Sequence, residues 1–113
     1  MDLSKAHRTL DRVIRLLADE KYSDLSRLAP QRLTADELRT AAREYPYKIV
    51  YPTVPLESLT DTIEITKSDP KRWSVVVDLW TKEEGRSDLS LELELSDSDG
   101  EFYGVEIDGL HVL

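Results

Sequence analysis

Residues 89–95 read LSLELEL, a stretch in which leucine alternates with serine or glutamate. Successive side chains of a β-strand point to opposite faces of the sheet, so this alternation predicts a strand with one apolar face and one polar face. The leucines are expected on the buried face, and Ser90, Glu92 and Glu94 on the face that meets water.

The segments on both sides of this strand have the same period of two. Residues 62–66 read TIEIT, residues 73–80 read WSVVVDLW, and residues 102–108 read FYGVEID. Turn residues separate these stretches, and connections this short favour an antiparallel meander of four strands. We expect the inward positions to be Ile63, Ile65, Trp73, Val75, Val77, Leu79, Tyr103, Val105 and Ile107, and the open face of the sheet to carry Glu64, Val76, Asp78, Trp80, Glu92, Glu94, Phe102, Glu106 and Asp108.

The first 20 residues predict an amphipathic helix, because apolar residues recur at steps of three and four from Leu3 to Leu17. Asp2 or Ser4 is its expected N-cap. The back of this helix is basic, and two interpretations are open: a face in contact with water, or a docking strip for an anion or an acidic partner. The residues of this basic face are Lys5, Arg8, Arg12 and Arg15.

Two more helices are expected before the sheet. Ser23 is the expected cap of a short helix that ends before Pro30, and TADE at 34–37 is a capping box that begins the next one. A proline-rich stretch follows, with an edge strand expected at 47–51. The chain is therefore expected to form one α+β domain over 1–113, with two to three helices on one face of a curved four-stranded sheet: a helical layer at 1–45, a connector at 46–60 and the sheet at 61–113.

The stretch from Val75 to Leu93 reads VVVDLWTKEEGRSDLSLEL. It resembles a family of small bacterial domains of unknown function that carries an LWT-x-EEGRSDL segment before a leucine-alternating strand. The order of helices, connector and meander is similar to the NTF2-like and cystatin-like superfolds, in which a long helix lies across a bent sheet. The resemblance implies this layout and no catalytic residues, since NTF2-like proteins include enzymes, ligand binders and interaction modules.

Composition narrows the classes of function. The chain has no cysteine, which excludes disulfides, thiolate metal sites and cysteine nucleophiles. Residues 1–57 carry 10 basic and 9 acidic side chains and residues 58–113 carry 5 and 14, so nucleic-acid binding through the second half is disfavoured. Neither a secretory signal nor a membrane helix is visible, so we expect a cytoplasmic protein without membrane contact. Its expected oligomeric state is a monomer or a homodimer.

Metal and cofactor motifs are weak. The sequence DSDG at 97–100 matches part of a calcium-binding loop, but Leu95 occupies the first ligand position, so a hairpin turn is the preferred interpretation. His7 and His111 are the only histidines, and zinc sites normally use three or four ligands. No cofactor, metal ligand or catalytic residue is assigned.

Residues 81–88, TKEEGRSD, are expected to form a long charged hairpin loop, which is the best candidate for a binding site. Carboxylates beside Arg86 could hold a cationic peptide or a metal. Alternatively, Gly85 supplies a positive φ, Arg86 pairs with Glu84 or Asp88, and Ser87 or Asp88 fixes the loop backbone. Together with the acidic sheet face, the candidate partner-binding residues are Trp80, Glu83, Glu84, Arg86, Asp88, Glu92 and Glu94.

These patterns support three hypotheses of function. The leading one is a non-enzymatic interaction module that holds a basic protein or peptide on its acidic face and loop, as an immunity or inhibitor protein would. The alternative is a small-molecule binder or minor enzyme, with a pocket lined by Trp73, Tyr45 or Tyr47 and at least one buried polar group. The third is self-association of the basic helix face with the acidic sheet of another copy.

Overall fold

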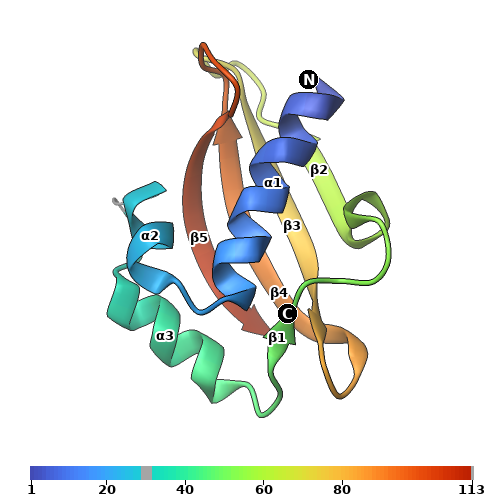
Figure 1. Cartoon of the computed structure of the whole chain (residues 1–113). Helices are drawn as coiled ribbons and strands as arrows, with labels where there is room; N and C mark the ends of the chain where they lie inside the picture. Colours follow the sequence, from blue (N-terminus) through green and yellow to red (C-terminus); the bar gives the residue numbers. More distant parts are fainter. Residues whose placement is uncertain (29–31, 113) are drawn as a thin grey trace.

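Three helices precede a five-stranded antiparallel sheet in the computed structural model, which describes residues 1–28 and 32–112 (Figure 1). The helices lie on one face of the sheet, which confirms the predicted α+β class. The sheet has a fifth strand because the connector contributes a short one. The elements are α1 (Leu3–Ala18), α2 (Tyr22–Leu28), α3 (Ala35–Glu44), β1 (Ile49–Val50), the 3-10 helix η1 (Leu56–Leu59), β2 (Thr60–Glu64), β3 (Arg72–Thr81), β4 (Gly85–Ser96) and β5 (Gly104–Val112).

Strands β3 and β4 form the centre of the sheet. β4 pairs with β3 on one side and with β5 on the other, and the second side of β3 is shared by β1 and β2. β2 pairs with residues 73–77 of β3, whereas β1 pairs with Trp80 and Thr81. The edge strand predicted at 47–51 is therefore confirmed in its position, and the sheet has β5 at one edge and β1 with β2 at the other.

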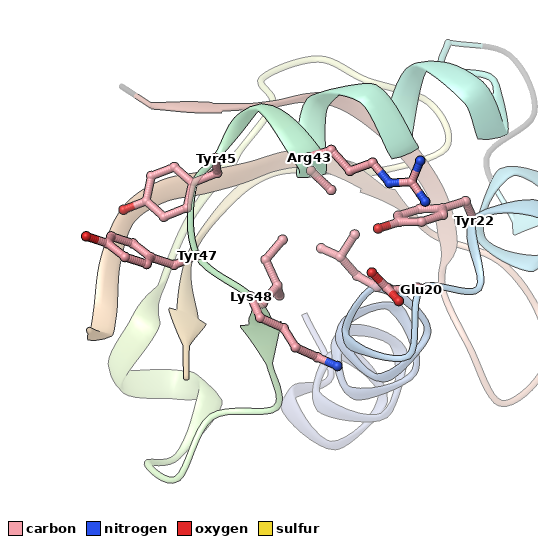
Figure 2. Close-up of a pocket in the computed structure, with 9 residues that line it drawn as sticks. Glu20, Tyr22, Arg43, Tyr45, Tyr47 and Lys48 are labelled. Atoms are coloured by element: carbon pink, nitrogen blue, oxygen red, sulfur yellow. The ribbon is translucent and has the colours of Figure 1, made fainter. Parts of the chain in front are cut away.

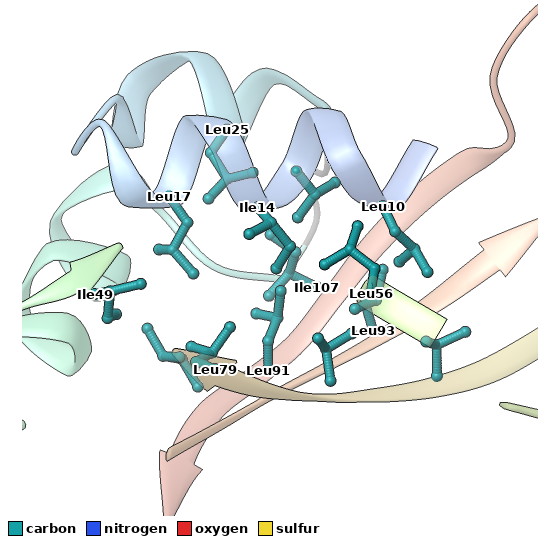
Figure 3. Packing of buried hydrophobic residues seen from close by; sticks show 14 of the residues in the cluster. Leu10, Ile14, Leu17, Leu25, Ile49, Leu56, Leu79, Leu91, Leu93 and Ile107 are labelled. Carbon is teal, nitrogen blue, oxygen red and sulfur yellow. The ribbon is translucent and has the colours of Figure 1, made fainter. Parts of the chain in front are cut away.

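The core lies between α1 and the sheet (Figure 3). The leucines at 89, 91, 93 and 95 are at most 2% exposed, which confirms the alternation predicted for β4. Figure 3 shows Leu10, Ile14 and Leu17 of α1 above Leu91 and Leu93 of the sheet. Full burial of one such side chain contributes about 1.5–3 kcal/mol, so this contact layer stabilises the fold more than any single polar contact.

The ends of α1 and α3 follow the sequence signals. The Lys5 N–H donates to Asp2 Oδ1 at 3.1 Å, and both bonds of the capping box between Thr34 and Glu37 are formed. α2 differs, because it begins at Tyr22 and Ser23 lies in its first turn instead of capping it. The side chain of Tyr22 is only 5% exposed, and burying it outweighs a cap of about 1 kcal/mol. Within residues 1–28 and 32–112, none of the helices combines the length and the apolar character that a bilayer-spanning segment requires.

The predicted orientation of β2 is wrong. The register pairs Ile63 with Ser74 and Glu64 with Trp73, and directly paired residues share a face. Ile63 therefore points to the open face, where it is 71% exposed, and Glu64 lies on the helix side. β2 sits at the sheet edge, where neither face is covered well enough for burial to dictate which side chains point inward.

The connection between β4 and β5 also differs from the prediction, because β5 begins only at Gly104. Residues 97–103 instead fold back onto the basic face of α1. The Arg12 guanidinium lies 3.9 Å from the centre of the Phe102 ring, and Lys5 and Arg8 donate to carbonyls of Ser98 and Glu101. Phe102 is thus absent from the open face. Lys5, Arg8 and Arg12 of the basic face bind this connection of their own chain, whereas Arg15 pairs with Asp11.

Candidate functional site

The charged loop predicted at 81–88 is much shorter in the structure. β3 continues to Thr81 and β4 starts at Gly85, which leaves only Lys82, Glu83 and Glu84 between the strands. Gly85 has a φ of 75°, the left-handed conformation that a three-residue hairpin requires. This confirms the positive φ expected for Gly85 if the segment serves to turn the chain. The Glu84 N–H donates to Thr81 Oγ1 at 3.0 Å and tightens the turn. Residues 85–88, half of the predicted loop, are therefore part of β4.

The two glutamates of this turn bind the connector. The Lys48 N–H donates to Glu83 Oε2 at 3.1 Å, and the Tyr45 hydroxyl donates to Glu84 Oε1 at 2.6 Å. The hydrogen bond to Glu84 raises the pKa of Tyr45, with burial adding to it. These carboxylates hold the connector against the hairpin, so they are only partly available to a partner.

Arg86 lies on the open face of the sheet, which we define as the face opposite the helices. It forms two hydrogen bonds with Asp78 Oδ2, from Nε at 3.0 Å and from Nη2 at 2.6 Å. The predicted pairing with Glu84 or Asp88 is therefore wrong, because the strand pairing places Arg86 opposite Trp80 and within reach of Asp78, two residues along β3 on the same face. Ser87 Oγ donates to the Leu79 carbonyl at 2.8 Å across the irregularity in the pairing, which confirms that Ser87 fixes the backbone here.

The carboxylates on β4 and β5 form a cluster on the open face, together with cations of the same chain. Glu94 pairs with Arg72 at 3.2 Å, and Glu92 lies 3.3 Å from His111 Nε2. Arg32 reaches both Glu106 and Asp108 from the segment before α3. Burial and the neighbouring Glu94 raise the pKa of Asp108, which reflects the concentration of negative charge. Among the described residues, no group of three or more His, Cys, Asp or Glu side chains is suited to hold a metal ion.

An apolar strip lies beside this cluster on β2 and β3. Ile63, Val76 and Trp80 all point to the open face, and Trp80 is half-buried against Gly85, where an added Cβ would lie 3.3 Å from the indole ring. No helix of the described part of the chain covers these side chains (Figure 1). The open face therefore combines an apolar strip with an acidic, partly neutralised half.

A separate hollow of about 300 Å³ lies where α1, α3 and β1 meet (Figure 2). Its floor is apolar and its wall contains Tyr45 and Tyr47, as the pocket hypothesis expected, whereas Trp73 is buried against Tyr103 at a ring separation of 5.2 Å. The buried Tyr22 supplies a polar group, and burial raises its pKa, with Glu20 adding to the effect. The lining residues are Leu17, Glu20, Tyr22, Ala42, Arg43, Tyr45, Tyr47, Lys48 and Ile49.

The candidate residues from the sequence are only partly brought together. Trp80, Arg86, Glu92 and Glu94 share the open face, whereas Glu83 and Glu84 lie at the turn and Asp88 is exposed in the irregular part of β4. Sequence reasoning missed the cations that neutralise the face and the residues of β2 on it. The sequence pattern contains neither the strand register that places Asp61, Ile63, Arg72 and His111 on this face nor the contact that Arg32 makes with β5 from the segment before α3.

The comparisons with known proteins give a family and no function. A family model described as a domain of unknown function (DUF7668) matches residues 14–113. Neither the curated proteins nor the solved structures give a match. The matched range contains every strand of the sheet and all of the candidate residues named above on the open face. The chain therefore belongs to the DUF7668 family of domains of unknown function.

Proposed function

We propose that this domain is a non-enzymatic protein-interaction module that binds a basic protein through its open face. The observation that carries the proposal is an uncovered sheet face on which Ile63, Val76 and Trp80 lie beside a cluster of carboxylates. Protein interfaces typically combine an apolar centre, rich in aromatic residues, with a charged rim. The carboxylate cluster then selects a positively charged partner and orients it, and the apolar strip supplies the contact area.

The charge balance of the open face favours a cationic partner even after its internal pairs are counted. The carboxylates Asp61, Asp78, Glu92, Glu94, Glu106 and Asp108 outnumber the arginines Arg32, Arg72 and Arg86 that reach them. The paired carboxylates remain between 19% and 34% exposed, so a partner can share them without breaking each pair. An acidic surface of this kind accelerates association with basic proteins, as an immunity or inhibitor role requires.

We further propose that the domain works in the bacterial cytoplasm and that its layout is NTF2-like or cystatin-like. The support is the LWTKEEGRSDL segment at 79–89, the order of helices before a curved sheet, and a chain without cysteine. In this setting, its partner is a basic protein of the same compartment.

Reversing charge at Glu92 and Glu94 tests the interaction module. We expect the double Glu→Lys variant to bind a lysine-rich synthetic peptide about tenfold or more weakly at low ionic strength, because two attractive charges become repulsive. Isothermal titration calorimetry measures the affinity. The matched control reverses Asp19 and Glu44, which are exposed on the helical side and leave the open face unchanged. Equal loss in both variants, or no loss in either, would show that the open face is not the binding surface.

A second candidate function is binding of a small zwitterionic molecule in the hollow of Figure 2, and the backbone of Glu20 favours it. Glu20 follows α1 in the left-handed region at φ 59°, within a Schellman motif in which Lys21 N–H donates to the Leu16 carbonyl. Glycine is the residue that suits this position. The carboxylate of Glu20 faces Arg43 and Lys48 across the hollow, and none of the three has an ion-pair partner among the described residues. A ligand that carries both charges would satisfy all of them.

Replacing Glu20 with glycine tests this second function, because the substitution should raise stability while it removes ligand binding. We expect Glu20→Gly to raise the free energy of unfolding by about 0.5–1 kcal/mol, because it removes the left-handed strain, and to abolish binding of zwitterionic L-phenylalanine. Urea unfolding and NMR titration measure the two effects. Lys67→Gly is the matched control, since Lys67 has a φ of 61° in a turn away from the hollow. A wild-type protein that does not respond to L-phenylalanine, or a Glu20→Gly variant that binds it normally, would exclude this function for the hollow.

A further inference from the structure

Strand β2 presents an unpaired edge. It pairs only with β3, and Ile65 N–H donates to the Arg72 carbonyl at 2.9 Å. Hydrogen-bonded pairs alternate along an antiparallel ladder, so the groups directed at β3 belong to residues 61, 63 and 65. The backbone N–H and carbonyl groups of Thr62 and Glu64 therefore point away from the sheet, and they have no partner among the described residues. Such an edge is a template for one more strand.

An apolar groove runs between this edge and the start of α1. It has a volume of about 300 Å³, and its lining includes Leu3, Ala6 and Leu10 from α1 and the helix-side residues Thr60 and Thr62 of β2. Leu3 is 78% exposed, although it belongs to the apolar stripe of α1. Exposed apolar side chains beside an open strand edge are the two features that a bound extended peptide requires, since its backbone pairs with the edge and its alternate side chains enter the groove.

The open-face side of the same edge carries the carboxylate of Asp61. Asp61 and Ile63 point to the open face, and directly paired or diagonal residues of an added strand would contact them. On the groove side, Glu57 lies 3.1 Å from His7 Nδ1, and Glu64 lies 3.8 Å from Lys71 Nζ. An added strand with apolar residues toward the groove and basic residues toward Asp61 complements both sides.

We propose that the β2 edge binds an extended segment of the partner, with apolar and basic residues in alternation, as an additional antiparallel or parallel strand of the sheet. The proposal rests on the proposed function for the basic character of the partner, and it adds the site and the mode of binding. The segment forms backbone hydrogen bonds with Thr62, places its apolar side chains against Leu3 and Leu10, and extends the open face by one strand.

The probe is a short synthetic peptide that alternates valine and lysine. Its control is a peptide of the same composition with the valines and the lysines in two separate blocks, which preserves charge and apolar content but not the alternation. We expect the alternating peptide to bind about tenfold or more tightly than the block peptide. We also expect the Thr62 amide to become protected from hydrogen exchange on binding, which surface association through charge alone would not produce.

Two variants test the site itself. Thr62→Pro removes a backbone N–H that points outward, so it blocks the added strand and leaves the ladder with β3 intact. Leu3→Asp removes an exposed apolar contact and adds negative charge, so its effect cannot come from weaker charge attraction. Each should weaken the alternating peptide about tenfold or more, with an unfolding midpoint close to that of the wild type. Leu3→Asp keeps the test valid should Thr62→Pro perturb the strand.

The outcomes distinguish this inference from the proposed function. If Thr62→Pro and Leu3→Asp bind the alternating peptide as the wild type does, while the Glu92 and Glu94 reversal does not, the open face binds the peptide and the edge does not. If all variants bind equally, both proposals fail. Loss in the edge variants together with protection of the Thr62 amide establishes the added strand.

Discussion

Replacing Leu91 with alanine should lower the free energy of unfolding by about 3–5 kcal/mol, the largest effect we expect from a single substitution. Leu91 is 0% exposed in the middle of β4, between β3 and β5 and below α1 (Figure 3). This loss of stability has two parts: the transfer free energy of the removed carbon atoms, and the cost of a cavity that the surrounding side chains cannot fill. Chemical denaturation followed by tryptophan fluorescence measures it, since the indole of Trp73 is buried in the same core.

The matched control for Leu91 is Ile63→Ala. The sequence pattern places Ile63 in the core as firmly as Leu91, but the structure leaves it 71% exposed. We therefore expect its substitution to change the free energy of unfolding by about 0.5 kcal/mol or less. A cost near that of Leu91→Ala would mean that β2 has the opposite orientation and that Ile63 points into the core instead of lying on the open face.

Replacing Thr9 with valine should cost about 1–3 kcal/mol, although the two side chains have nearly the same shape. Thr9 is 0% exposed, and its hydroxyl accepts the Tyr103 N–H at 3.0 Å and donates to the Lys5 carbonyl at 2.8 Å. Valine would leave the Tyr103 N–H buried without an acceptor. Urea unfolding measures the cost, and faster hydrogen exchange at the Tyr103 amide locates it.

The control at this position is Thr9→Ser, which keeps the hydroxyl and loses one methyl group. It should retain the slow exchange of the Tyr103 amide and cost roughly 1 kcal/mol, the value for one buried methyl group. If the valine variant is as stable as the wild type, the bond between α1 and residues 97–103 contributes nothing to the fold.

The parts of the fold that local chemistry dictates could be predicted from the sequence. The leucine alternation of β4 and the capping box of Thr34 and Glu37 are confirmed in full, because each depends on residues a few positions apart. The orientation of β2 could not be predicted, since alternation gives a period and burial alone selects which face turns inward. At an edge strand that selection is weak, and the pairing with β3 decides it instead.

The acidic character of the candidate site could be predicted from the sequence, but the ion pairs that partly neutralise it could not. The acidic residues of β4 could be read from the alternation, but their neutralisation by Arg32, Arg72 and His111 depends on contacts between residues far apart in the chain. The loop at 81–88 was predicted too long because its charged residues look like a solvent-exposed segment. In the structure, the bonds of Ser87 to its neighbours let β4 continue through that segment.

The contacts between α1 and residues 97–103 join two segments that are synthesised at different times. The Asp2 N–H donates to the Tyr103 hydroxyl at 2.8 Å, a contact between residues 101 positions apart. On the ribosome, α1 emerges before its partners in the sheet, so its apolar stripe stays uncovered until β3 and β4 have been synthesised, and its basic face until residues 97–103 follow. A nascent chain that extends only to the end of β3 therefore exposes apolar side chains of α1 and β3, the kind of surface that chaperones bind.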